Sequence, residues 1–183
     1  MSNSNQYLIL PEYNSEIVYQ ELLPKLQVFS QNIEGNISLW REHMQFFLHF
    51  AETVHHFHLP EIHDNIIENL FTLIQSGNNH LRQAIAKLLA AIIVNQYDPE
   101  RRQTLSDQIV EQLAEGSAFH MRKTFVYFCK ECAGKLISQY FLDKFYEPFL
   151  KMSDDKVPSV RLEFSKALPD IKPYVDAEQE RDF

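Results

Sequence analysis

Hydrophobic positions recur along this chain at spacings of three and four residues, which places them on one stripe of an α-helix. The pattern is clearest after four pairs in which an apolar residue precedes an arginine: Trp40-Arg41, Leu81-Arg82, Met121-Arg122 and Val160-Arg161. The residues 3, 6, 7 and 10 positions after each arginine are apolar in all four segments. The arginines are 41, 40 and 39 residues apart. The sequence therefore contains a repeat of about 40 residues.

A second helical pattern precedes each pair. The residues 12 positions before the arginines are apolar, namely Phe29, Leu70, Val110 and Phe149. Short polar turns separate the two helices, and Asp98-Pro99 suits the N-cap and first position of one upstream helix. A single helix pair cannot bury its apolar stripes, whereas stacked pairs share a continuous core. We therefore predict an all-α fold, an α-solenoid of about four helix-turn-helix repeats.

The array is expected to occupy residues 17–175, with units at about 17–58, 59–97, 98–138 and 139–175. Residues 1–16 include the amphipathic stretch QYLILPEY, which could cap the exposed end of a solenoid. Residues 176–183 are predicted to be a tail. A fragment of a longer solenoid and a small stand-alone array are both open at this point.

Composition and charge limit the fold classes, partners and compartments that we expect. The chain has 183 residues, a formal net charge of −8 and only 4 glycines, so a turn-rich β-fold is disfavoured. The negative charge disfavours nucleic acid or an anionic membrane as the main partner. No apolar run reaches the length of a membrane span, and the start lacks the pattern of a secretory signal. Two cysteines suit a reducing compartment, so we expect a cytosolic or nuclear protein.

Two local motifs invite a chemical interpretation. Cys129 and Cys132 form a Cys-x-x-Cys motif, but both occupy positions of the apolar stripe, so we predict core packing rather than redox or zinc chemistry. Histidines gather at residues 55, 56, 58 and 63. Because Pro60 divides them between one helix end and the next helix start, we expect a loop with incidental histidines, and a metal site is the alternative.

Catalytic constellations are missing from the sequence. There is no glycine-rich phosphate loop, no Gly-x-Ser-x-Gly and no nucleophile with a base beside it. We therefore expect a protein that is not an enzyme and needs no cofactor.

The last unit carries a family resemblance. The turn and second helix of FYEPFLKMSDDKVPSVRLEFSKALPDI resemble a HEAT repeat, and more narrowly the repeats of scaffold and regulatory subunits of type 2A-family protein phosphatases. The residues that match this pattern are Pro148, Leu150, Met152, Asp155, Val157, Val160, Arg161, Ser165, Leu168 and Pro169. The resemblance to HEAT repeats extends from about Ile17 to Val175.

The resemblance also implies a role for the arginines. In HEAT proteins such an arginine commonly pairs with an acidic turn residue of a neighbouring repeat, and the candidates here are Asp154, Asp155 and Glu115. We expect a partly exposed pair that contributes about 0–1 kcal/mol and sets the register of the repeats.

Two surfaces are candidates for binding a partner. The fifth position after each arginine points away from the apolar stripe and holds Phe46, Lys87, Tyr127 and Lys166. The turns within the repeats are the sites where, by resemblance to phosphatase scaffolds, other subunits dock. These turns contribute Asn36, Asn78, Phe119, His120, Lys156 and Pro158. Phe119 is the strongest candidate because it is a large apolar residue in a turn.

Together these features predict a non-catalytic scaffold for protein–protein interaction. The resemblance implies a regulatory or scaffold subunit of a serine/threonine protein phosphatase, with a phosphatase catalytic subunit as its partner. The alternative is an adaptor in nuclear transport or in a cytoskeletal or axonemal assembly. Nucleic acid and membrane partners are not expected.

Overall fold

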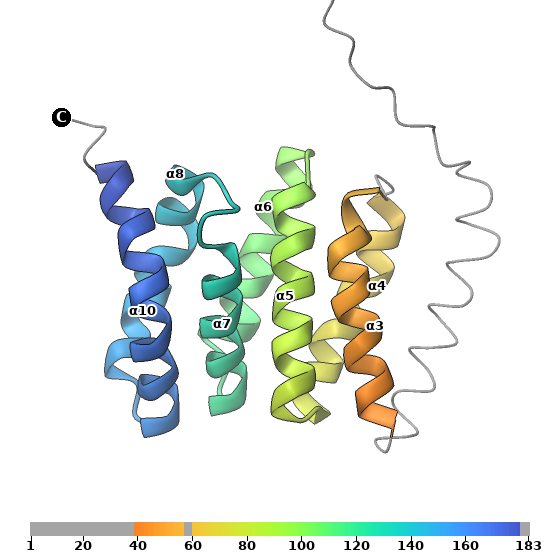
Figure 1. The fold of residues 1–183 in the computed structure, drawn as a ribbon, viewed down its shortest axis with the longest axis horizontal. Coiled ribbons are helices and arrows are strands. Elements are labelled where there is room, and N and C mark those ends of the chain that lie inside the picture. Colours follow the sequence, from red (N-terminus) through yellow and green to blue (C-terminus); the bar gives the residue numbers. More distant parts are fainter. Residues whose placement is uncertain (1–38, 57–59, 180–183) are drawn as a thin grey trace, which may run out of the picture.

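The computed structural model describes residues 39–56 and 60–179, and every regular element in these ranges is helical. The helices form two layers (Figure 1). One layer consists of α3 (Trp40–Thr53), α5 (Asn79–Asn95), α7 (Phe119–Cys132) and α10 (Pro158–Gln179). These four helices lie side by side, and each contacts the next. The predicted all-α fold is confirmed for the described residues.

The other layer lies behind the first in Figure 1. It contains α4 (Pro60–Ser76), α6 (Pro99–Ile109), α8 (Ser138–Phe141) and α9 (Glu147–Lys151). A π-helical turn, Val110–Ala114, extends α6, and a second one, Leu142–Tyr146, joins α8 to α9. Helices of the two layers alternate along the chain, which is consistent with an α-solenoid.

Local signals begin two of these helices. The Asp98 side chain accepts hydrogen bonds from the backbone N–H groups of Glu100 (2.9 Å) and Arg101 (3.3 Å), and Pro99 is the first residue of α6, as predicted. Asn78 caps α5 in the same way, because its Oδ1 accepts a hydrogen bond from the N–H of Leu81 at 3.0 Å.

The predicted apolar stripes form the core between the layers. The stripes consist of the 16 positions that lie 3, 6, 7 and 10 residues after the four arginines, on α3, α5, α7 and α10. Of these, 13 are buried, and Ile85, Leu88 and Phe128 are completely inaccessible to solvent. The other three, Met44, Leu48 and Leu168, are partly buried and lie on α3 and α10, the outermost helices of this layer among the described residues. No helix in the described residues is both long and apolar enough for a membrane span.

Connections of two kinds lie on opposite edges of the molecule. The turns that lead into α5, α7 and α10 lie along the lower edge in Figure 1, and the loops that follow α5 and α7 lie along the upper edge. The turns before α5, α7 and α10 thus share the lower edge, because each helix pair runs in the same direction as the pair before it.

Candidate partner-binding surface

The turns that lie along the lower edge are here called the turn ridge. It consists of residues 74–82, 115–122 and 153–161, which end one helix and begin its partner, together with the start of α3. The repeated arginines donate hydrogen bonds to backbone carbonyl groups at these turns. Arg82 Nε donates to the backbone oxygen of Ile74 at 2.8 Å, and Arg161 Nη1 donates to the backbone oxygen of Asp155 at 2.6 Å. The positively charged side chains satisfy carbonyl groups that a helix end leaves without a partner.

Arg122 joins two neighbouring turns. Its Nη1 donates to the carbonyl oxygens of Gly116 and Ser117, both at 2.8 Å. Its Nε and Nη2 donate to the two carboxylate oxygens of Asp155 at 2.5 and 3.2 Å. Asp155 in turn accepts the N–H of Val157 at 2.8 Å. Of the three acidic candidates, Asp155 is therefore the partner across the repeats.

The predicted exposure of this pair is wrong. Arg122 and Asp155 are each only 9% exposed, so the pair is buried rather than partly exposed. The hydrogen bonds from Arg122 hold the pKa of Asp155 below its ordinary value, although burial acts in the opposite direction. Asp154 and Glu115 make no ion pair with the described residues. The sequence could not reveal the burial, because it depends on how closely the next repeat packs.

An open groove of about 640 Å³ lies on the turn ridge between the second and third helix pairs. Gln75 lines it from the end of α4, and Glu111 and Glu115 line it from the π-helical turn that extends α6 and the residue that follows this turn. Gly116, His120 and Met121 complete this part of the wall. The groove thus contains two carboxylates at a site where two repeats meet.

Phe119 stands beside this groove at the first position of α7. Its side chain is 47% exposed and meets the His120 ring edge-on, with the ring centroids 5.7 Å apart. Burial lowers the pKa of His120, and the positive charge of Arg82 lowers it further, so the imidazole is neutral at neutral pH. The turn ridge therefore presents an exposed aromatic side chain next to a negatively charged groove.

A second aromatic pair extends the turn ridge toward the first described helix. The rings of Trp40 and His80 are stacked with centroids 5.7 Å apart, and the Arg41 guanidinium lies 4.4 Å from the centroid of the Trp40 ring. His80 and His120 both stand two residues before a repeat arginine. Sequence reasoning missed this pair and Glu111, and it considered Glu115 only as a partner for an arginine. The shared register of the two histidines was a usable signal for the pair.

The other predicted turn residues occupy the turn ridge in different ways. Asn78 is partly buried and serves as a helix cap, whereas Lys156 and Pro158 are exposed at the start of α10. Asn36 lies outside the described residues. Their role in binding stays a prediction.

The second predicted surface, at the fifth position after each arginine, is less exposed than expected. Tyr127 is only 9% exposed, and its hydroxyl donates to Asn79 Oδ1 at 3.1 Å. Phe46 is partly buried and stacks on Phe50. The expected row of outward-pointing side chains is thus interrupted, because α7 packs between two neighbouring helices.

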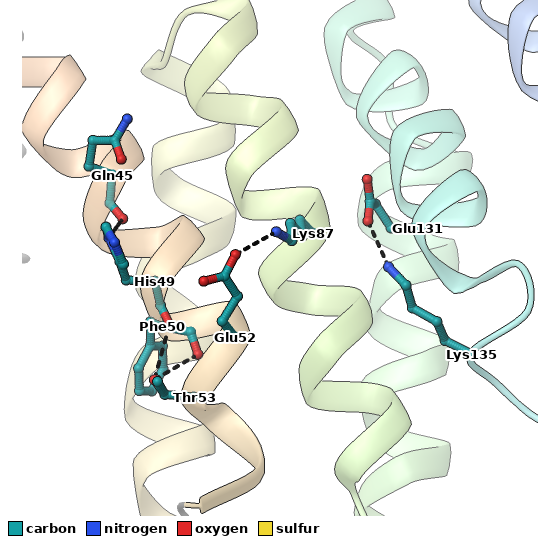
Figure 2. Close-up of polar contacts among 8 residues, drawn as sticks. All are labelled: Gln45, His49, Phe50, Glu52, Thr53, Lys87, Glu131 and Lys135. Carbon is teal, nitrogen blue, oxygen red and sulfur yellow. Dashed lines mark hydrogen bonds and ion pairs between the residues drawn. The ribbon is translucent and has the colours of Figure 1, made fainter.

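The two lysines of that row form ion pairs. Lys87 of α5 reaches Glu52 of α3 at 3.3 Å, as Figure 2 shows, and Lys166 pairs with Glu163 at 3.2 Å. In each pair at least one of the two side chains is largely exposed, so each pair contributes little to stability. Lys87 and Lys166 remain accessible, and a binding role for them also stays a prediction.

The cysteine motif lies in the core, as predicted. Cys129 and Cys132 are free thiols with no exposed surface. Burial raises the pKa of both thiols well above the ordinary value, which disfavours the reactive thiolate.

The predicted histidine cluster lies largely outside the part of the chain that the structure describes. His58 falls in the undescribed segment, and of the side chains of His55, His56 and His63 only that of His55 is described. Elsewhere in the described ranges no group of three His, Cys, Asp or Glu side chains could hold a metal ion.

The sequence is distantly similar to a phosphatase regulator. It is 22% identical over 153 residues to the serine/threonine-protein phosphatase 4 regulatory subunit 4 of Homo sapiens. The subunit of the same name in Mus musculus matches with the same identity and length. In both comparisons the match covers 83% of this chain and 17% of the relative, so the chain spans a small part of the length of these proteins. No family model matches the chain, and no solved structure does.

Proposed function

We propose that this chain is a non-catalytic, HEAT-type scaffold that acts as a regulatory subunit of a serine/threonine protein phosphatase complex. The observation that carries the proposal is the similarity to phosphatase 4 regulatory subunit 4, which extends over 83% of the chain. The two helical layers and the repeat of about 40 residues support HEAT-type units. The proposed location is the cytosol or nucleus, which the two unpaired cysteines support.

The mechanism of such a subunit is positioning. Solenoids bind partners through surfaces that recur on one side of every repeat, and the turn ridge is such a surface. Phe119 supplies exposed apolar area there, while the Arg122–Asp155 pair holds two turns in a common register. A catalytic or adaptor subunit bound along the turn ridge would be oriented by a rigid surface and would need no reactive group from this chain.

Affinity purification tests this proposal. The tagged chain is recovered from its native cell, the eluate is assayed for serine/threonine phosphatase activity, and the co-purified proteins are identified by mass spectrometry. We expect a type 2A-family catalytic subunit and its activity in the eluate. Recovery of transport or cytoskeletal proteins without phosphatase activity would overturn the proposed function and favour an adaptor.

A matched pair of variants locates the contact. Phe119→Ala removes an exposed apolar side chain from the turn ridge, and Ile137→Ala removes one that is 67% exposed on the opposite edge. We expect Phe119→Ala to lower the recovered phosphatase activity about tenfold, which corresponds to about 1.4 kcal/mol, and Ile137→Ala to leave it unchanged. Equal recovery with both variants would mean that the turn ridge is not the contact surface.

A further inference from the structure

The groove on the turn ridge offers charge and apolar contact side by side. Its two glutamates, Glu111 and Glu115, are exposed and make no ion pair with any described residue. Phe119 lies next to the groove wall formed by His120 and is itself half exposed. The carboxylates and the phenyl ring are therefore available together to a molecule that binds from solvent.

The two arginines nearby form no ion pair with the groove glutamates. Arg122 is engaged by the Asp155 carboxylate and by the carbonyl oxygens of two turn residues. Arg82 donates to the carbonyl oxygens of Ile74 and Gln75 at the end of α4. Both guanidinium groups thus donate into the turns rather than to Glu111 or Glu115, which leaves the two carboxylates able to accept hydrogen bonds from a partner.

We propose that this groove binds a basic segment of a protein partner, in which an arginine or lysine contacts Glu111 and Glu115 and a neighbouring apolar side chain packs on Phe119. The proposal rests on the proposed function, since it names the chemistry of the partner that the turn ridge receives. Charge complementarity selects the occupant, because carboxylates form their strongest hydrogen bonds with guanidinium and ammonium groups. The chain's net charge of −8 acts in the same direction and favours encounter with a basic surface.

The exposure of the site predicts a contact that depends on salt. Open carboxylates are screened by ions, so binding should weaken as ionic strength rises. Two exposed ion pairs of ordinary strength correspond to about a three- to tenfold change in affinity. The apolar contact with Phe119 should persist at high salt, which separates the two contributions.

Fluorescence anisotropy with a defined probe tests the groove directly. The probe is a short labelled peptide of alternating leucine and arginine, and its companion carries glutamate in place of arginine. We expect the full chain to bind the arginine peptide in preference to the companion. The double variant Glu111→Gln/Glu115→Gln should weaken this binding about three- to tenfold.

Matched variants control for net charge and for apolar area. Glu100→Gln/Glu147→Gln removes the same number of charges from exposed positions outside the groove, and Ile137→Ala is the control for Phe119→Ala. Thermal melts followed by circular dichroism establish that each variant is folded. Weaker binding confined to the groove and Phe119 variants supports the proposal. Equal weakening by the control variants, or no preference for the arginine peptide, overturns it.

The same variants distinguish a failure of the groove proposal from a failure of the proposed function. If, in the affinity purification, phosphatase activity co-purifies equally with the wild type and with Glu111→Gln/Glu115→Gln, the groove proposal fails and the proposed function stands. If no phosphatase co-purifies with the wild type but the groove variants still bind the arginine peptide more weakly, the proposed function fails. The basic segment then belongs to another partner.

Discussion

The buried pair between Arg122 and Asp155 gives the sharpest test of how the repeats are held together. Asp155→Asn keeps the shape of the side chain but removes its charge, so Arg122 stays buried without its counter-ion. Breaking a buried ion pair from one side costs about 3–5 kcal/mol. Arg122 retains its hydrogen bonds to the carbonyl oxygens of Gly116 and Ser117, so we expect the lower end, about 3 kcal/mol.

Thermal unfolding followed by circular dichroism measures this loss. In a chain of this size 1 kcal/mol shifts the Tm by about 2–4 °C, so Asp155→Asn should lower it by about 6–12 °C. Asp170→Asn is the matched control, because the Lys130–Asp170 pair also connects α7 to the last helix pair, at 3.0 Å, with side chains that are 49% and 52% exposed. We expect this control to cost less than about 1 kcal/mol. If the two variants melt at the same temperature, the buried pair does not stabilise the contact of α7 with the turn that precedes α10.

The dependence of stability on pH provides a second check of the same pair. The hydrogen bonds from Arg122 hold the pKa of Asp155 in the folded state below its ordinary value, which is about 3.9 in an unfolded chain. The stabilisation is therefore complete above the unfolded-state pKa and is lost as pH falls through the folded-state pKa. The difference in free energy of unfolding between wild type and Asp155→Asn should be constant near neutral pH and shrink below about pH 4. A difference that grows on acidification would contradict the assignment.

Two further predictions concern the core. Leu88→Asp should unfold or strongly destabilise the chain, because Leu88 has no exposed surface and an unpaired carboxylate would enter the core; Gln83→Asp, at an exposed position of the same helix, should melt close to the wild type in circular dichroism. Cys129 and Cys132 should both resist a thiol reagent such as DTNB in the native protein and react fully in denaturant, since burial raises the pKa of each thiol; rapid native labelling would show that α7 is not packed as described.

Sequence reasoning was most successful where a pattern has a local cause. The period of the apolar residues follows from the geometry of the α-helix, so positions such as Ile85 and Phe128 could be assigned to the core from spacing alone. The start of α6 at Asp98-Pro99 was predictable for the same kind of reason, because a cap depends on neighbouring residues only.

Sequence reasoning was less successful where the environment of a side chain depends on a neighbouring repeat. Tyr127 points away from the stripe of its own helix, as its position predicts, yet it is buried against Asn79 because α5 packs alongside. The groove beside Phe119 was missed because its wall combines Gln75 with Glu111 and Glu115, which come from different helix pairs.

The sequence by itself determined the helical elements, their repeat and the stripe that each one buries, because these depend on interactions within a few residues of the chain. Only the tertiary structure decided that Arg122 meets Asp155 out of solvent, and that two glutamates line one groove together with Gln75 of the preceding helix pair. The physical reason is that burial and charge pairing depend on distances between separate helices, and those distances are fixed by how the repeats pack.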